Sequence, residues 1–417
     1  MMNLQNVIEN FQTFNNFARN PKNGGINRIA FSHPERVAAL KFSMLCQKAG
    51  LDVYFDFFGN VIARREGKQP SLKPIVLGSH IDTVKDGGQY DGLLGVLGAL
   101  EVVEHLNAHH IETDHPIIII AFACEESTRF NEATLGSKYL TGKMAKDDMK
   151  FIKDNDDNVL YDIVAPLAQD MNGKTALFER NKIKAFLELH IEQGPILENN
   201  QKDIGIVTDI AAPHRFKLQI AGVTSHSGST PMPMRTDALT TAAEVILKIE
   251  ALGQAYHDKG IVTTVGYANV YPNTMNAIPG EVTLLIDIRG KDKSIREKVV
   301  EEMKVHIETI TTNRQADYVL EDLGQDQPRK FNQTIAKISE HSCKTLAYQY
   351  RYMYSGAGYD AMNFAPICPT SMIFIPCKNG ISHSPKESVT DSQIEKGINV
   401  MIATTIELAK VDTVLDA

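Results

Sequence analysis

The chain has 417 residues, of which 43% are hydrophobic and 23% charged, a balance typical of a soluble globular protein with two or three domains. Its net charge of -8 comes with both signs interspersed and no basic run, which argues against nucleic acid as the main partner. The N-terminus lacks a secretory signal, and no apolar stretch approaches the ~18 residues of a membrane span. We therefore predict a cytoplasmic protein with no membrane partner.

Helix and strand patterns alternate in the first half of the chain. Ser32 precedes a predicted helix that ends at Gly50. Apolar runs over 74–80, 115–127 and 183–194 each end in polar residues. Runs of this length fit buried strands of a mostly parallel sheet, and ligands bind at the carboxyl edge of such a sheet. The polar stretch 145–175 is expected to be an irregular surface excursion.

The pattern changes at about residue 212 and returns at about 331. Between these points we predict strands over 213–222, 261–271, 281–289 and 316–322, and helices over 235–256 and 292–313. A strand over 371–376 and a helix over 389–410 follow. The sequence thus predicts an α/β protein whose larger, discontinuous domain (1–211 and 329–417) has a mostly parallel sheet flanked by helices. A smaller α+β domain (212–328) is inserted in it.

Several predicted strands end in residues that can bind metal. His80 closes the first apolar run, and Asp82, on the same face, is placed to accept its second ring N–H. Asp91 opens the next predicted helix, where a helix cap and a metal-bridging carboxylate are both natural. The five cysteines are scattered without a C-x-x-C pair, so any metal must be bound by His, Asp and Glu.

The adjacent carboxylates of Glu125 and Glu126 end a run that is otherwise buried. Such a pair repels unless a cation lies nearby. One carboxylate would bind the metal, while the other would take a proton from water. His190 and His383 complete a set of three imidazoles and two or three carboxylates, which suits Zn, Mn, Co or Ni. Two metals ~3.5–4 Å apart would need a bridging carboxylate.

The order of these motifs resembles the M20 clan of metallopeptidases and amidohydrolases. Within it, the chain resembles the hydantoinase/carbamoylase branch, which includes N-carbamoyl-L-amino acid hydrolases, allantoate amidohydrolases and beta-ureidopropionases. The matching stretches are GSHIDTVKDGGQYDGLLGVLGALE, FACEESTRF, LGSKYLTG, ELHIEQGPILE, SHSGSTPMPMRTDAL, NAIPGEVTLLIDIR, SGAGYDAM and GISHSP.

The resemblance implies two divalent metal ions per subunit. His80, Asp91 and His190 would bind one ion. Asp91, Glu126 and His383 would bind the other, with Asp91 bridging, and Glu125 would be the general base.

The resemblance also implies roles for the inserted domain. Residues 212–328 would form the lid and the interface of a homodimer. His226 would stabilise the oxyanion, often from the neighbouring subunit. Asn276 and Arg289 would hold the substrate, with Arg289 clamping its carboxylate. Gln193 would contact the ureido or amide group.

Two departures bear on the substrate. Tyr359 stands where the family usually has His, and IAAPHRF (210–216) differs from the corresponding run of many allantoate enzymes. The leading interpretation is cleavage of a C–N bond of an N-carbamoyl-L-amino acid or a related ureido acid. An N-acyl amino acid deacylase or dipeptidase is the nearest alternative. A non-catalytic metal- or ligand-binding protein is another alternative. The presence of Glu125, which would bind no metal, argues against it.

Overall fold

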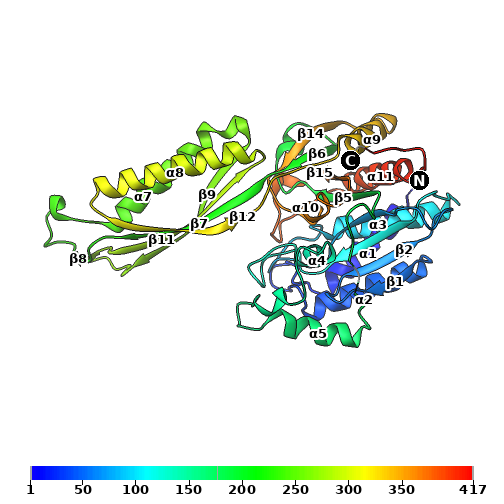
Figure 1. The fold of residues 1–417 in the computed structure, drawn as a ribbon, viewed down its shortest axis with the longest axis horizontal. Coiled ribbons are helices and arrows are strands. Elements are labelled where there is room, and N and C mark those ends of the chain that lie inside the picture. The colour runs from blue at the N-terminus through cyan, green and yellow to red at the C-terminus, as the bar shows by residue number, and fades with distance from the viewer. Residues whose placement is uncertain (1, 176, 416–417) are drawn as a thin grey trace. The chain divides into compact units, whose positions relative to one another are not determined.

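The computed structural model describes residues 2–175 and 177–415. The chain divides into two compact units: unit 1 is Met1–Thr208, Lys330–Met353 and Tyr359–Ala417, and unit 2 is Asp209–Arg329 and Tyr354–Gly358 (Figure 1). We expected 354–358 in the larger domain. It lies in unit 2 because Ser355 accepts the Ala211 N–H and Gly356 accepts a bond from Arg289, at 2.8 and 2.9 Å. No described helix is long and apolar enough to cross a membrane.

A nine-stranded sheet has the order β1-β2-β4-β3-β5-β15-β6-β13, with β14 paired to β6. The strands are β1 (Asp52–Phe55), β2 (Val61–Arg65), β3 (Ile75–His80), β4 (Ile117–Phe122), β5 (Ala185–Ile191), β6 (Ile204–Ile210), β13 (Arg329–Lys330), β14 (Tyr350–Ser355) and β15 (Thr370–Ile375). The central strands β4, β3, β5 and β15 are parallel, whereas β2 and β6 run antiparallel to their neighbours. The predicted α/β architecture with a mostly parallel sheet is confirmed.

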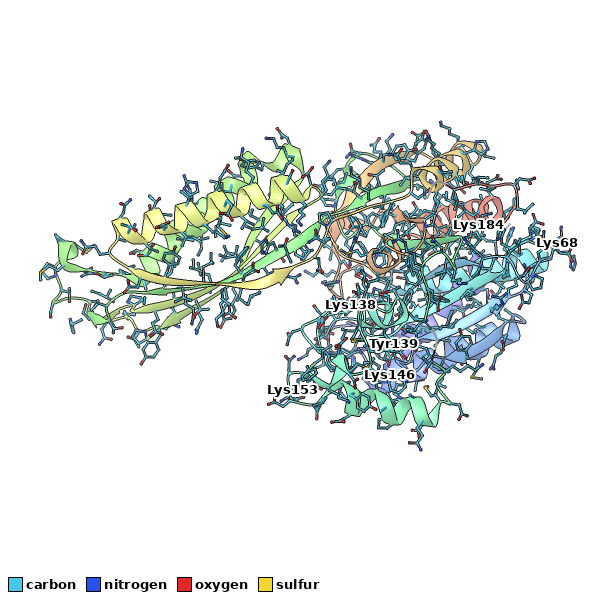
Figure 2. The ribbon with its side chains drawn as sticks, viewed as in Figure 1. Lys68, Lys138, Tyr139, Lys146, Lys153 and Lys184 are labelled. Atoms are coloured by element: carbon cyan, nitrogen blue, oxygen red, sulfur yellow. The ribbon has the colours of Figure 1, made fainter. Side chains whose placement is uncertain are left out.

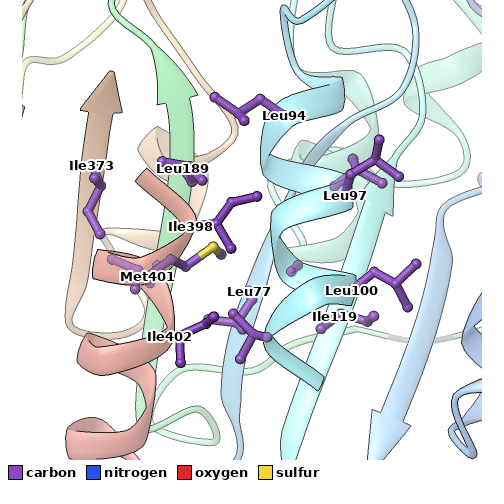
Figure 3. Packing of buried hydrophobic residues seen from close by; sticks show 14 of the residues in the cluster. Leu77, Leu94, Leu97, Leu100, Ile119, Leu189, Ile373, Ile398, Met401 and Ile402 are labelled. Atoms are coloured by element: carbon purple, nitrogen blue, oxygen red, sulfur yellow. The ribbon is translucent and has the colours of Figure 1, made fainter. Parts of the chain in front are cut away.

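Helices flank this sheet. They are α1 (Leu4–Asn16), α2 (His33–Lys48), α3 (Leu93–Ala108), α4 (Leu135–Leu140), α5 (Leu160–Asp170), α6 (Ile196–Asn199), α9 (Gln333–Thr345), α10 (Ala361–Phe364) and α11 (Asp391–Leu408). Figure 3 shows α3 and α11 side by side over the strands, with Ile398 and Met401 of α11 next to Leu189 of β5. These side chains are almost fully buried. Their close packing holds the central strands, and with them the residues at the carboxyl ends, in fixed positions.

The stretch 145–175 is more regular than we expected, because it contains α5. Leu160, Val164 and Ala168 recur every four residues and are buried, so this polar segment still has one apolar helical face. Figure 2 shows Lys146 and Lys153 on the same side of unit 1 as α5. The helix was hard to predict because Pro166 lies inside it, and proline normally breaks a helix.

Unit 2 contains a four-stranded antiparallel sheet of order β12-β7-β11-β9. Its elements are β7 (Ala212–Ala221), α7 (Ala238–Ala255), β9 (Ile261–Tyr271), β11 (Glu281–Gly290), α8 (Lys293–Asn313) and β12 (Asp317–Gln325), with a short ribbon of β8 (Ser225–His226) and β10 (Ala277–Ile278). Alternate residues of β11, such as Leu284 and Ile286, are buried with Val299 and Met303 of α8. Helix α7 starts three residues later than predicted, because Asp237 caps it by accepting the N–H of Leu239.

Short 3-10 turns lie at Asp148–Lys150, Met232–Met234, His257–Lys259 and Lys378–Gly380.

Candidate metal centre

The carboxyl ends of β3, β4 and β5 bring the predicted ligands together. His80 is the last residue of β3, His190 is close to the end of β5, and the two glutamates follow β4. Three groups of side chains have ligand atoms close enough to share an ion. They are His80–Asp91–His190, Asp91–Glu126–His383 and His80–Glu125–Glu126. All five predicted ligands therefore meet, and Glu125 lies among them.

Asp91 lies at the centre of the cluster. Its Oδ1 atom is 3.3 Å from His80 Nε2 and 3.2 Å from His190 Nε2, and its Oδ2 atom is 3.3 Å from His383 Nε2. Asp91 does not cap α3, whose N-cap is Gly92 without a side-chain bond. Gly92 has a positive φ of 65°, and a Cβ there would collide with the ring of His80. The turn before α3 therefore requires glycine to let the imidazole approach.

The hydrogen bonds of the histidines show which ring nitrogens can bind a metal. The Nδ1 atom of His80 lies 3.0 Å from the Asp82 carbonyl, and that of His190 lies 2.9 Å from the Ile191 carbonyl. A carbonyl only accepts, so each Nδ1 carries the hydrogen. Gly92 N–H donates to His190 Nε2 at 3.1 Å. The Nε2 lone pairs thus face acceptor oxygens of Asp91, an arrangement that fits a cation bound by nitrogen and oxygen.

The pKa values of the cluster also indicate a site for positive charge. Burial raises the pKa of Glu125 well above its usual value and that of Glu126 to about 7. Although burial opposes it, His190 helps to hold the pKa of Asp91 well below its usual range. The hydrogen bond with Asp91 raises the pKa of His383 to about 9. The cluster therefore attracts positive charge, which protons or metal ions can supply.

Asp82 has a different contact from the one we predicted. Its carboxylate accepts the backbone N–H of Glu125 and of Glu126, each at 3.0 Å. Its Oδ1 atom lies 3.7 Å from His80 Nδ1, which bonds to the Asp82 carbonyl instead. Cys124, with a φ of 56°, turns the chain so that both N–H groups point at Asp82. The carboxylate therefore orients the two glutamates rather than the imidazole.

Gln193 also lies in the cluster. Its Nε2 atom donates to Asp91 Oδ2 at 2.5 Å and lies 3.3 Å from His383 Nε2. Its Oε1 atom accepts the hydroxyl of Tyr359 at 2.8 Å. The side chain predicted to contact the substrate is thus bonded to the central carboxylate.

The remaining predicted residues lie at opposite ends of unit 2. Ser227 N–H donates to the Asn276 carbonyl at 3.0 Å, which holds Asn276 beside His226 in the ribbon at one end (Figure 1). Arg289 lies at the other end of β11, where its Nε bonds to Asp287 at 2.9 Å. Arg289 is eight residue steps along the strand from Glu281, which is next to the ribbon, a span of about 26 Å. The structure therefore pairs His226 with Asn276 and separates both from Arg289.

The ring of His226 has a defined tautomer. The backbone N–H groups of Gly228 and Ser229 lie 3.1 and 3.2 Å from its Nδ1 atom, which must accept. The hydrogen is therefore on Nε2, and the side chain is exposed. His226 thus offers an outward N–H donor.

Residues 76–407 match the family described as Peptidase family M20/M25/M40. The chain belongs to this M20 family. It is 37% identical over 390 residues to the N-carbamoyl-L-amino-acid amidohydrolase of Pseudomonas sp. (strain NS671), covering 93% of this chain and 94% of that one. It is 33% identical over 413 residues to the ureidoglycolate hydrolase of Arabidopsis thaliana, covering 97% and 86%.

Solved structures agree with this M20 assignment. The structure of a hydantoinase/carbamoylase family amidase from Burkholderia multivorans superimposes with a TM-score of 0.92 at 32% identity and covers 98% of each chain. The resemblance drawn from the motifs is confirmed.

Sequence reasoning did not identify the buried acids around this M20 cluster, among them Glu387. Glu387 is 2% exposed, and its carboxylate accepts the Tyr90 N–H at 2.8 Å and the Ser382 hydroxyl at 2.7 Å. The same hydroxyl lies 2.6 Å from Asp91 Oδ2. Glu387 therefore ties the loop that carries His383 to the turn that carries Asp91. Its only signal in the sequence is its place four residues after His383.

Proposed function

We propose that the protein is a metal-dependent amidohydrolase that cleaves a C–N bond of N-carbamoyl-L-amino acids or related ureido acids. The observation that carries the proposal is the set of imidazole Nε2 atoms directed at the buried carboxylate of Asp91. The names of the relatives, an N-carbamoyl-L-amino-acid amidohydrolase and a ureidoglycolate hydrolase, support the kind of bond.

We assign two divalent ions, Zn, Mn, Co or Ni, to the cluster. His80, Asp91 and His190 would hold the inner ion, and Asp91, Glu126 and His383 the outer one. Imidazole and carboxylate without thiolate match these metals. Such ions supply a Lewis acid and lower the pKa of a water toward neutrality.

Glu125 is the proposed general base. Both ligand sets are complete without it, and its side chain is buried beside them, with Oε2 3.8 Å from His80 Nε2. A carboxyl with a raised pKa accepts and returns protons near neutral pH. Glu125 would take a proton from the attacking water and return it to the leaving nitrogen, while Asp82 holds its backbone in place.

Unit 2 would act as lid and dimer interface. The Nε2–H of His226 is suited to stabilise a developing oxyanion, Asn276 lies beside it, and Arg289 would clamp the substrate carboxylate. A small substrate cannot span the ~26 Å that separates the ribbon from Arg289 in one subunit. His226 would therefore come from the partner subunit of a homodimer.

The outer edge of unit 2 fits such an interface. Strand β9 is at the edge of the four-stranded sheet, and its side chains Val262, Tyr267 and Tyr271 are 49%, 49% and 64% exposed. A long edge strand with exposed apolar side chains is a natural template for pairing with a second chain. We further propose a cytoplasmic location, which the five unpaired, buried cysteines support.

A substrate panel tests the proposal. The purified protein with Mn²⁺, Co²⁺ or Zn²⁺ is offered N-carbamoyl, N-formyl and N-acetyl amino acids and dipeptides, each also as its carboxamide. We expect the N-carbamoyl acids to be turned over fastest, with release of ammonia, and the carboxamides poorly, because they lack the carboxylate that Arg289 binds. Dominant dipeptide turnover would favour the peptidase alternative instead. Ion binding without any turnover would favour a non-catalytic binding protein.

A further inference from the structure

Tyr359 is held firmly in the interior of unit 1. It is 2% exposed, and its ring lies 4.7 Å from that of His190 and 5.6 Å from that of Phe374. These contacts leave the phenol little freedom to move. The hydroxyl therefore presents a fixed donor to Gln193 Oε1, 2.8 Å away.

Asp91 determines the direction of the two hydrogen bonds that link it to Gln193 and Gln193 to Tyr359. The ionised carboxylate of Asp91 can only accept, so the amide group 2.5 Å from its Oδ2 atom must be the NH₂ of Gln193. The amide oxygen then faces Tyr359, whose hydroxyl donates to it. Asp91 thus selects one of the two flipped positions of the amide, and the Tyr359 hydroxyl adds a second hydrogen bond in that position.

The backbone of Gln193 is also in an uncommon conformation. Its φ of 56° lies in the left-handed region, which is unfavourable for residues other than glycine. Such a conformation persists where surrounding contacts determine it. The bonds to Asp91 and Tyr359 are contacts of this kind.

In this position, the Gln193 amide contacts only one side of the cluster. Its NH₂ group lies against Asp91 Oδ2 and 3.3 Å from His383 Nε2, both proposed ligand atoms of the outer ion. Asp91 Oδ1, facing His80 and His190, is on the inner side. The amide nitrogen is thus close to both Asp91 Oδ2 and His383 Nε2, and His383 Nε2 has a single lone pair, which cannot accept a hydrogen and bind a cation at once.

We propose that Tyr359 is a positioning residue that holds the Gln193 amide against Asp91 and His383, where the amide competes with the outer metal ion. The outer ion then binds more weakly than it would without the amide. This inference rests on the proposed function, which assigns the two ions.

Calorimetric titration with Mn²⁺ tests the inference without measuring turnover. The Tyr359→Phe variant frees the amide to turn away, so we expect one of its two binding steps, that of the outer ion, to tighten roughly fivefold, the effect of about one hydrogen bond. The other step should stay the same. Tyr350→Phe is the matched control, because it removes a hydroxyl that donates to Glu340 at 2.6 Å; both of its steps should match the wild type.

A second variant separates this effect from general damage. Gln193→Gly suits the left-handed backbone and removes the amide, so the same step should tighten at least as much. Adding Tyr359→Phe to Gln193→Gly should change nothing more, because Tyr359 acts through Gln193.

Two results would overturn the inference alone: no tighter binding step in Tyr359→Phe, or a further change in the double variant. A wild type that binds no Mn²⁺ would overturn the proposed metal centre itself.

Discussion

The carboxylate of Asp82 accepts the backbone N–H of Glu125 at 3.0 Å. Through this bond, and its equivalent to Glu126, the residue after β3 positions the two acids after β4. Both oxygens of Asp82 are used, and the side chain is fully buried.

Replacing Asp82 by Asn should therefore disturb the acids while leaving the ligand set intact. The amide has one accepting oxygen, so one of the two N–H groups loses its acceptor. We expect kcat to fall roughly 10–100-fold and the melting temperature to drop, as measured by steady-state kinetics and calorimetry. Asp52→Asn makes the same change on the exposed side of β1 and should alter neither. Unchanged kcat in Asp82→Asn would refute the positioning role.

Glu125→Gln tests the general base. The amide keeps the size of the side chain and loses its basicity, so turnover should fall on the order of 10²–10⁴-fold. Because Glu125 belongs to neither proposed ligand set, elemental analysis should still find two ions per chain. Full activity would exclude the role of base, and loss of one ion would make Glu125 a ligand.

Arg289 and Arg215 bond to the same carboxylate, that of Asp287, and they provide a matched pair. Arg289→Met should raise KM roughly 10–100-fold, because a charge-assisted bond to the substrate carboxylate is lost. Arg215→Met removes an equal charge and should leave KM within about twofold. Equal effects of the two substitutions would show that Arg289 acts only through Asp287.

Exchange between subunits can be tested by mixing inactive variants. His226→Ala lacks the oxyanion donor, and Glu125→Gln lacks the base. A mixed dimer rebuilds one complete site, if His226 comes from the partner, so random mixing should restore about a quarter of the wild-type activity. No recovery, despite mixed dimers in native mass spectrometry, would place His226 in its own subunit's site.

The Tyr267→Lys substitution at the β9 edge should yield monomers in light scattering.

The buried carboxyl of Glu35 should make the free energy of unfolding depend on pH. It is 3% exposed, and burial raises its pKa from 4.5 to about 8. The folded state thus binds the proton more tightly than the unfolded state does. The resulting stabilisation is complete below pH 4.5 and is lost as the pH rises toward 8.

The Gln side chain of Glu35→Gln cannot ionise. The stability of this variant relative to the wild type should therefore increase as the pH rises from 4.5 toward 8. The difference in unfolding free energy should change by up to about 1.4 kcal/mol per pH unit, as measured by urea unfolding at pH 5, 6.5 and 8. Glu112→Gln, at an exposed position, should show no such trend. A difference that stays constant with pH would mean that Glu35 is ionised in the folded protein.

The sequence predicts the architecture better than it predicts contacts. The bounds of β9 match the predicted 261–271 because its ends coincide with a glycine turn and a proline. Helix α5 was missed because Pro166, a residue that normally breaks a helix, lies inside it.

Contacts within the cluster were harder to predict for a different reason. The bonds of Asp82 to the glutamates, and of Tyr359 to Gln193, depend on the turn at Cys124 and on rotamers set by neighbouring strands. Local periodicity carries no information on either.

The side chains around Asp91 come from places as far apart in the chain as His80 and His383. Ions bound there would join both ends of unit 1, and by mass action they would favour the folded chain in proportion to their supply. In a cell with little available metal, a larger fraction of the protein would be unfolded and exposed to proteolysis. The amount of the protein would then depend on the metal supply as well as on gene expression.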